Sequence, residues 1–267
     1  MKLGACVVLY EKNEKILNNI NTYLPFCESV VAVDNGNNPI EGDGIVYISM
    51  GGNCGVAAAL NRGLKTLEEL GCDVALTMDD DSCFPLELAE EILPVVEEEL
   101  KTHSIVGMNF NYFPEIRGKV VNKTKFWLTS GNFVKIDAWR AAGGYKEELF
   151  IDYVDFEFCF RAGRVCYLRD YSISHKIGNP IEFRLFGKSF HAMNHSPLRD
   201  YYRFRNSRYL AKKYMGAFAA EYAKELFWQL PKMLIFEKNR REKLKMIKRG
   251  LKDAGKGRLG KYEEEIS

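Results

Sequence analysis

The sequence of 267 residues lacks any apolar run that approaches the ~20 residues needed by a membrane-crossing helix. Its apolar beginning, residues 5–10, is too short for a span or a signal sequence and predicts a buried first strand. The seven cysteines are scattered and form no CxxC pair, which argues against a disulfide framework or a zinc site. That pattern fits a reducing compartment, so we expect a cytoplasmic protein.

The chain also lacks internal repeats, low-complexity tracts and a nucleic-acid-binding motif. Nucleic acid is therefore not among the partners that we expect. With 46% hydrophobic and 28% charged residues, the composition is that of an ordinary globular protein. The length allows one large domain, or one domain with an appendage.

Charge is distributed unevenly along the chain. Residues 1–196 hold 19 basic and 27 acidic residues, a net charge of −8, whereas residues 197–267 hold 19 and 9, a net charge of +10. We expect a catalytic domain over residues 1–196 and a basic helical extension, packed on it, over residues 197–267. Such a basic segment favours an anionic contact, and a membrane surface is one candidate. A solvated helix face is the alternative.

The first two thirds of the sequence alternate short β-type runs with amphipathic helical patterns. This rhythm predicts an α/β fold with a mixed, mostly parallel central sheet and helices on both faces. Ligands of such sheets bind at the carboxyl ends of the strands. The predicted strands are residues 5–10, 30–33, 45–48, 74–78 and 105–109, and the predicted helices are residues 14–24, 55–70, 85–100 and 155–162.

Three adjacent aspartates, Asp79, Asp80 and Asp81, follow the fourth predicted strand directly. Three like charges repel one another, so the segment should need a cation. Carboxylates suit Mg²⁺ or Mn²⁺, and alternate residues can face one point, so Asp79 and Asp81 form a natural pair of ligands. A solvated acidic turn is the alternative interpretation.

Six motifs occur in order along the chain. They are Val33–Gly36, Asn53–Gly63, Met78–Ser82, Thr129–Asn132, Leu149–Arg161 and Ser196–Asn206. Together they resemble the family-two glycosyltransferases of the GT-A fold, and in particular their rhamnosyltransferase branch. The similarity covers about residues 5–255. It implies a GT-A fold with a C-terminal helical extension, and an enzyme that transfers a sugar from a nucleotide-sugar donor with inversion.

The resemblance implies which residues bind the donor. Asp34 would accept a hydrogen bond from the pyrimidine base; its alternative is a turn-forming role. Asn53 and Gly55 lie where a helix N-terminus and a close backbone approach would cradle the nucleotide, although Asn53 can equally cap that helix. Donor binding is also expected of Asp79, Asp80, Ser130 and Gly131.

In the enzymes that this chain resembles, a divalent ion bridges the two donor phosphates and stabilises the departing nucleoside diphosphate. The resemblance implies that Asp81, with Asp79, binds this ion, either Mg²⁺ or Mn²⁺. It also implies that His175 completes the coordination. The alternative for His175 is an ordinary histidine that binds no metal.

Asp155 matches the position of the general base in the family pattern. Inversion requires one carboxylate on the side opposite the leaving group, to take the proton of the attacking acceptor hydroxyl. Glu157 should instead pair with Arg161, which lies four residues later on the same helical face. The alternative is that Asp155 only caps a helix.

Basic and aromatic residues alternate in the motif Ser196–Asn206. We expect Arg199 and Arg205 to assist the donor phosphates or an anionic acceptor; a helix packed by its aromatic side is the alternative. The apolar segment Leu226–Phe236 precedes a basic run, which suits a helix lying in the interface of an anionic membrane. Packing within the protein is the alternative. We therefore expect a cytoplasmic protein that is peripheral on the inner face of the plasma membrane.

Other enzyme classes fit the sequence less well. A phosphatase with an aspartate nucleophile wants its acidic motif after the first strand, and a nucleotidyltransferase wants a glycine-rich basic loop there, which Tyr10–Glu14 does not provide. A catalytically inactive nucleotide-sugar-binding protein of the same fold is a further alternative. The presence of Asp81, Asp155 and His175 argues against it.

The expected donor is dTDP-rhamnose, because Leu149–Arg161 and Ser196–Asn206 resemble the rhamnosyltransferase branch most closely. Asp80 departs from that branch and favours the alternative, a UDP-linked galactofuranose or hexose. Asp34 would serve thymine and uracil equally. The acceptor is expected to be a glycan or lipid-linked glycan of surface polysaccharide synthesis, contacted by residues 110–127 and 180–194.

Overall fold

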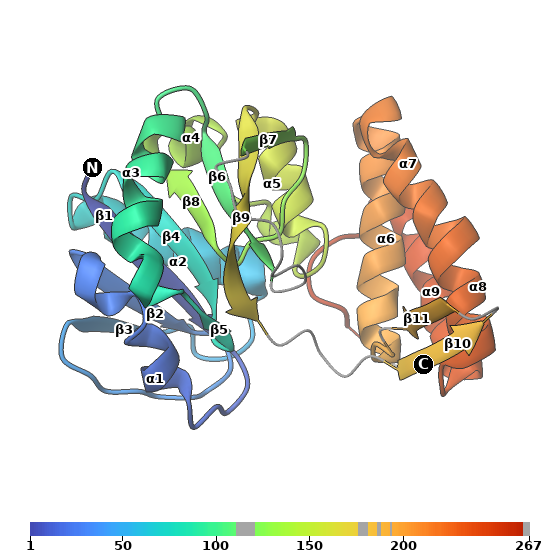
Figure 1. The fold of residues 1–267 in the computed structure, drawn as a ribbon. Helices are drawn as coiled ribbons and strands as arrows, with labels where there is room; N and C mark the ends of the chain where they lie inside the picture. The colour runs from blue at the N-terminus through green and yellow to red at the C-terminus, as the bar shows by residue number, and fades with distance from the viewer. Residues whose placement is uncertain (111–120, 176–180, 186–187, 193, 264–267) are drawn as a thin grey trace. The chain divides into compact units, whose positions relative to one another are not determined.

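The computed structural model describes residues 1–110, 121–175, 181–185, 188–192 and 194–263. Its chain forms two compact units, drawn in Figure 1. The first comprises Met1–Glu147 and Val154–Lys176, and the second comprises Glu148–Tyr153 and Ile177–Ser267. The second unit thus begins before residue 197, where we predicted the extension to start, and it includes a short loop from the middle of the chain.

A mixed nine-stranded sheet forms the centre of the first unit (Figure 1). Its strand order is β3-β2-β1-β4-β8-β6-β9-β5, and β7 pairs with β9. The strands β1 to β4 are parallel, as are β6 and β9, whereas β8 runs antiparallel to both neighbours. The strands are β1 Leu3–Leu9, β2 Ser29–Asp34, β3 Ile45–Ser49, β4 Val74–Asp79, β5 Ser82–Cys83, β6 Ile105–Phe110, β7 Val121–Thr124, β8 Asn132–Lys135 and β9 Val165–His175.

Helices cover both faces of this sheet, as the alternating pattern predicted. Alternate residues of β1, from Leu3 to Leu9, share one hydrophobic cluster with Ile20 of α1 and Ile92 of α3. Helix α2 packs on the opposite face, where a Cβ on Gly63 would lie only 2.2 Å from Cys6 Sγ. The helices of this unit are α1 Ile16–Ile20, α2 Val56–Glu69, α3 Ala89–Glu99, α4 Ile136–Ala141 and α5 Val154–Ala162.

The predicted strands and the second helix agree with the structure to within about two residues. The first and third helices are shorter than predicted. Residues 14–24 give only α1, because Leu24 begins a separate 3₁₀ turn with Pro25 near its start. Residues 85–100 give a 3₁₀ turn, Leu86–Leu88, before α3 begins at Ala89.

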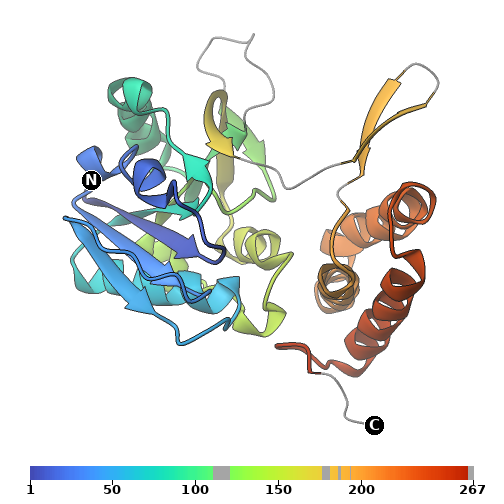
Figure 2. The ribbon, with the colours of Figure 1, turned by 90° about the horizontal axis from the view of Figure 1, so that it is seen from below.

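The second unit is mainly helical, as the sequence predicted after Leu198. Figure 2 shows its helices with the hairpin β10–β11, whose strands are Ile181–Leu185 and Lys188–Ala192. None of the helices that the structure describes is both long and apolar enough to span a membrane. The helical segments are α6 Pro197–Lys213, α7 Gly216–Lys224, a π-helical turn Glu225–Gln229, α8 Leu230–Phe236 and α9 Arg240–Lys256.

Candidate active site

Two acids predicted to bind the donor lie at one edge of the sheet. Asp34 ends β2 and Asp79 ends β4, with β1 between these two strands. In the sheet register, Leu9 of β1 pairs with Asp34 and Val8 pairs with Asp79. Two strand spacings, about 10 Å, therefore separate the two backbones. The expectation that both acids end parallel strands at a common edge is confirmed.

The carboxylate of Asp34 is engaged within the protein. Its Oδ1 accepts hydrogen bonds from the N–H groups of Gly36 (2.9 Å) and Asn37 (2.7 Å). Its Oδ2 accepts from the N–H of Asn38 (2.7 Å) and the hydroxyl of Tyr47 (2.6 Å). Four such bonds use all the lone-pair positions of a carboxylate. Asp34 therefore forms the turn after β2, and a pyrimidine N–H would have to replace one of these donors.

The charge of Asp34 is stabilised by the same contacts. Burial raises the pKa of this carboxyl group, which is 1% exposed, but the four hydrogen bonds outweigh burial and the pKa lies below its usual value. The side chain is therefore an anion at neutral pH. Its role in recognising the base stays a prediction.

Asn53 and Gly55 shape the loop that enters α2. Asn53 Oδ1 accepts hydrogen bonds from the N–H of Gly55 (3.0 Å) and from Nδ2 of Asn35 (3.3 Å). Asn35 Oδ1 in turn accepts from the N–H of Cys54 (2.8 Å), so the loop is tied to the end of β2. Gly55 has a φ of 92°, a left-handed value that a side chain disfavours, and it is the N-cap of α2. Asn53 thus organises the turn before the helix.

The three aspartates do not act alike in the structure. Asp80 Oδ2 accepts a hydrogen bond from the N–H of Tyr10 (2.9 Å), and its carbonyl accepts from Nδ2 of Asn13 (2.9 Å) and Asn19 (2.8 Å). Burial raises the pKa of Asp80, and the adjacent charge of Asp81 raises it further. Asp80 therefore holds the loop between β1 and α1, and its donor contact stays a prediction.

Ser130 and Gly131 support the end of β4. Ser130 Oγ accepts a hydrogen bond from the N–H of Asp79 (3.1 Å) and lies 2.8 Å from Ser82 Oγ. The N–H of Gly131 donates to the carbonyl of Thr77 (2.8 Å), and Gly131 has a φ of 74°. Both residues were predicted to bind the donor. Their observed contacts position the aspartate segment, and donor contact stays a prediction.

The backbone brings His175 next to the aspartate segment. Strand β5 begins directly after Asp81, and Ser82 of β5 pairs with His175 at the end of β9. Residues far apart in the sequence thus become neighbours at the place where the family pattern puts the metal. The side chain of His175 lies outside the described part of the chain, so its coordination stays a prediction.

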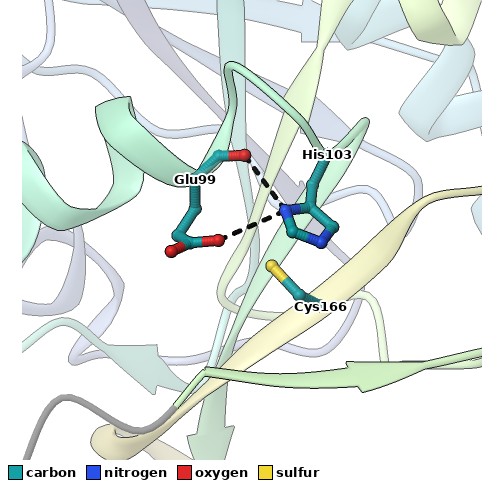
Figure 3. A group of neighbouring side chains, drawn as sticks. All are labelled: Glu99, His103 and Cys166. Atoms are coloured by element: carbon teal, nitrogen blue, oxygen red, sulfur yellow. Dashed lines mark hydrogen bonds and ion pairs between the residues drawn. The ribbon is translucent and has the colours of Figure 1, made fainter.

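Figure 3 shows a second group of side chains whose types can bind metals. It lies near the amino ends of β6 and β9, away from the three aspartates. Within the described residues, ligand atoms of Glu99, His103 and Cys166 all lie within 4.8 Å of one another. His103 Nδ1 is 3.2 Å from Glu99 Oε2 and 3.1 Å from the Glu99 carbonyl, which ends α3. Burial raises the pKa of Cys166 to about 12, so its thiol stays protonated. The contacts fit a histidine that caps the C-terminus of α3.

Asp155 and Glu157 have different surroundings in α5. Asp155 lies in the first turn, partly exposed, and its Oδ1 accepts a hydrogen bond from the N–H of Phe156 (2.9 Å). Glu157 is fully buried and binds Nε and Nη2 of Arg161 at 2.7 and 2.6 Å. The predicted pair Glu157–Arg161 is confirmed. Of these two acids, only Asp155 is accessible to solvent.

An aromatic pair lies beside the candidate base. The ring of Phe156, the residue after Asp155, stacks on Phe126 with the centroids 5.1 Å apart and the planes 5° apart. Phe126 belongs to the segment that we predicted to contact the acceptor, most of which lies outside the described residues. The stacking thus places the end of that segment next to the start of α5.

The loop before α5 has an unusual backbone. Phe150, Asp152 and Tyr153 have φ values of 67°, 61° and 65°, in the left-handed region that residues with a Cβ disfavour. Each such residue costs about 1–3 kcal/mol and persists only where its surroundings enforce it. Strain of this kind clusters at functional sites, and Asp155 follows Tyr153 by two residues.

Helix α6 enforces this loop conformation within the second unit. Asn206 Nδ2 donates to the carbonyls of Leu149 (2.9 Å), Ile151 (2.8 Å) and Asp152 (2.9 Å). The hydroxyl of Tyr153 donates to Glu225 Oε1 (2.8 Å). We call the segment Glu148–Tyr153 the clamped loop.

Arg205 has a role other than the one we predicted. Its side chain is 1% exposed, and its N–H groups donate to the carbonyls of Gly260 (2.6 Å) and Leu149 (2.9 Å). The guanidinium also lies over the rings of Tyr201 and Tyr202. The guanidinium therefore binds the clamped loop and the C-terminal segment. Because it is buried and engaged there, the prediction that Arg205 contacts a phosphate is corrected.

Arg199 keeps part of its binding capacity. Its side chain is 47% exposed, and its Nε and Nη2 lie 3.3 Å from Asp152 Oδ1. A phosphate or anionic acceptor contact by Arg199 stays a prediction. The sequence did not indicate that Asn206 holds the clamped loop, although Asn206 lies in the motif Ser196–Asn206. It also gave no signal for Glu225, which directly precedes an apolar run.

Comparison with known proteins gives one curated relative at useful similarity. The chain is 30% identical over 238 residues to the dTDP-rhamnosyl transferase RfbF of Shigella flexneri, covering 78% of this chain and 79% of that protein. No family model matches the sequence.

Solved structures show a similar fold at low identity. The S. aureus TarS fragment 1–349 has a TM-score of 0.60 and 14% identity, covering 95% of this chain and 81% of that chain. The same fragment in complex with UDP-GlcNAc has a TM-score of 0.61 and 15% identity, covering 97% and 82%. These matches show that the mixed sheet and its helices form a glycosyltransferase fold of the GT-A kind.

Proposed function

This chain belongs to the family-two glycosyltransferases of the GT-A fold, in their rhamnosyltransferase-like branch, and on that basis we propose that it transfers L-rhamnose from dTDP-rhamnose with inversion. The acceptor is a glycan or lipid-linked glycan of surface polysaccharide synthesis. The similarity to a dTDP-rhamnosyl transferase over most of both chains carries this proposal.

Asp155 is the general base of the proposed reaction. As the acceptor oxygen forms its bond to the anomeric carbon, the bond from that carbon to the phosphate oxygen breaks, and the hydroxyl proton passes to Asp155. Glu157 cannot replace it, because its carboxylate is buried and bound by Arg161. The stacked pair Phe126 and Phe156 supplies an apolar surface beside the base that suits the face of an acceptor sugar.

Asp79, Asp81 and His175 would hold Mg²⁺ or Mn²⁺ on the side of the leaving diphosphate, opposite to Asp155. The pairing of Ser82 with His175 supports this set, because it brings an imidazole-bearing residue beside two carboxylates. When bound, the ion supplies Lewis-acid stabilisation of the departing diphosphate. Asp80 is not part of the set, since its carboxylate binds the backbone of Tyr10.

The contacts of Asp80 also bear on the donor. Its acidic character favoured a UDP-linked galactofuranose or hexose in the sequence. In the structure one oxygen of that carboxylate binds the N–H of Tyr10 in the loop after β1, a contact that does not involve the donor sugar. The engaged carboxylate of Asp34 does not separate thymine from uracil either. The choice of dTDP-rhamnose over a UDP-sugar, and of an enzyme over an inactive binding protein, therefore rests on the similarity to a dTDP-rhamnosyl transferase.

A donor screen tests this function. Turnover and calorimetric binding are measured for dTDP-rhamnose, UDP-galactofuranose and UDP-hexoses with Mg²⁺ and Mn²⁺. We expect a clear preference for dTDP-rhamnose. A clear preference for a UDP-sugar would overturn the rhamnose assignment, and absence of turnover with every donor would favour a binding protein.

The base is tested by Asp155→Asn. We expect transfer to fall by at least ~100-fold, the scale of general-base loss, with nucleotide binding nearly unchanged. Asp137→Asn is the matched control, because Asp137 is also an acid in the first turn of a helix, α4, and its side chain is exposed. Near-normal turnover of Asp155→Asn would dismiss this assignment.

A further inference from the structure

The outer face of one helical segment in the second unit is apolar. The segment runs from α7 through the π-helical turn to α8, residues 216–236. A surface helix normally turns polar residues outward. Here Phe227, Trp228 and Ile235 are 78%, 53% and 59% exposed, and Met215 just before the segment is 76% exposed. We call the exposed set the apolar face: Met215, Ala219, Ala220, Phe227, Trp228, Pro231 and Ile235.

These positions lie on one side of the segment. From Ala220 onward, exposed positions recur every three or four residues, at Lys224, Phe227, Trp228, Pro231 and Ile235, which is the spacing of one helical face; one of them, Lys224, is a cation. The inner side is apolar too, because Met233 is buried with Phe204 and Ile247. From Leu226 to Phe236 the helical segment therefore has apolar residues on both its inner and its outer side, which is typical of a helix that is covered on both sides. In the described structure only the inner side is covered.

The exposed charges around the apolar face are basic up to Arg241, and the next residue, Glu242, is an exposed acid. Between residues 212 and 241, a stretch that the structure describes completely, every charged side chain in the exposed class is basic. Two acids of this stretch are buried in ion pairs, Glu225 with Arg203 (2.7 Å) and Glu237 with Lys243 (2.5 Å). The third, Glu221, is 22% exposed and lies 3.8 Å from Lys224. The exposed basic residues are Lys212, Lys213, Lys224, Lys238, Arg240 and Arg241.

We propose that the apolar face docks on the surface of an anionic lipid bilayer. Apolar side chains enter the boundary between headgroups and acyl chains, and basic residues at both ends of the segment bind lipid phosphates. Trp228 suits this boundary, since indole rings favour it. The ammonium of Lys232 lies 5.9 Å from the centroid of that ring, within the range of a cation–π contact.

A second copy of the chain is the competing occupant. A twofold contact would place this surface against itself, so Lys224 and its basic neighbours would oppose like charges. Such contacts are unfavourable, whereas an anionic membrane neutralises the same cations. The charge pattern therefore favours lipid over self-association.

Docking on the membrane is linked to the clamped loop through Glu225. This residue begins the π-helical turn that carries Phe227 and Trp228, and it also binds Tyr153 and Arg203. The segment that contacts lipid is thus continuous with a support of the loop that precedes Asp155. The benefit for a lipid-linked acceptor rests on the proposed function, whereas lipid binding itself does not.

Vesicle flotation of the full chain tests the proposal. Vesicles of phosphatidylcholine with phosphatidylglycerol are compared with phosphatidylcholine alone, at low and high salt. We expect binding to the anionic vesicles only, weakened by salt. The double variant Phe227→Ser/Trp228→Ser should bind at least ~10-fold more weakly, because each substitution removes an aromatic ring whose burial in the bilayer would stabilise binding. Leu70→Ser/Leu86→Ser is the control, because both leucines are exposed in the first unit.

Two results would overturn the proposal. One is a failure of the vesicle test, seen either as no flotation with anionic vesicles at low salt or as equal binding by the double variant and the unsubstituted protein. The other is a dimer of the unsubstituted protein in sedimentation analysis together with a monomer of the double variant. That result would assign the apolar face to a second copy of the chain. Turnover on a water-soluble acceptor is measured in parallel and should not change in the double variant. Failure of the proposed chemistry therefore stays distinguishable from failure of docking.

Discussion

Asn206→Ala should impair catalysis without touching the candidate base. The amide of Asn206 serves three carbonyls of the clamped loop, those of Leu149, Ile151 and Asp152. The substitution removes these donors from the carbonyls of Ile151 and Asp152, whereas the Leu149 carbonyl keeps the N–H of Arg205. Three residues of this loop hold left-handed backbone angles. The loop is covalently continuous with α5. When it relaxes, the start of that helix, and with it Asp155, should lose its fixed position.

The magnitude follows from the number of hydrogens lost. An amide NH₂ group has two hydrogens, and a buried acceptor left unsatisfied costs about 1–3 kcal/mol, so the clamp loses at least about 2 kcal/mol. The strained backbone, at about 1–3 kcal/mol for each residue, favours relaxation once the clamp is gone. A loss of about 2 kcal/mol lowers the ratio of clamped to relaxed loop by about 30-fold. We expect kcat to fall, by up to about that factor.

The assay separates positioning from binding and folding. Turnover is measured together with calorimetric binding of the nucleotide and with thermal unfolding followed by circular dichroism. The nucleotide Kd should change much less than kcat, because Asp34, Asp79 and Asp81, the carboxylates assigned to the donor and its ion, are in the first unit, and of the donor contacts that stay predictions only Arg199 touches the clamped loop. Ser207→Ala is the control, since Ser207 is the buried neighbour of Asn206 and its hydroxyl bonds only within α6. A folded Asn206→Ala variant with kcat within twofold of the original would refute the reasoning.

Two further predictions concern the metal and the pH. Chelation should abolish transfer and added Mn²⁺ or Mg²⁺ should restore it, with Asp81→Ala weakening metal-dependent nucleotide binding; full activity in chelator would contradict the metal. Burial raises the pKa of Asp200 from 3.8 to about 6, despite Arg203 and Lys243 nearby. Because the folded state then binds that proton more tightly, the free energy of unfolding should fall as pH rises through this range. Asp200→Asn should remove that slope in denaturant titrations, and equal slopes would count against it.

The sheet and its edge could be predicted because their signals are local. Buried runs such as Val30–Val33 read as strands, and the acids that follow them must then lie at the carboxyl edge. The pair of Glu157 and Arg161 was predictable from helical spacing alone. The antiparallel strand β8, which lies between β4 and β6, gave no such signal because it is short and its partners are distant in sequence.

The roles of individual charged residues were harder to predict, because they depend on tertiary contacts. Arg205 reads as a free cation in sequence, yet the fold surrounds it with carbonyls and aromatic rings. Asp80 has the same side chain as its two neighbours, and only the tertiary structure shows that its carboxylate binds the N–H of Tyr10. The backbone angles of Phe150, Asp152 and Tyr153 could not be foreseen, since none of the three is glycine.

The clamped loop also limits how the enzyme can be divided or recombined. The chain leaves the first unit at Glu148, makes its contacts with α6 and the C-terminal segment, returns at Val154, and leaves again after Lys176. A chimera that exchanges only the C-terminal helices would therefore join a foreign α6 to a loop that it did not evolve to hold. Exchange of acceptor preference between relatives should require residues 148–153 to move together with the helices, as one module written in two pieces of sequence.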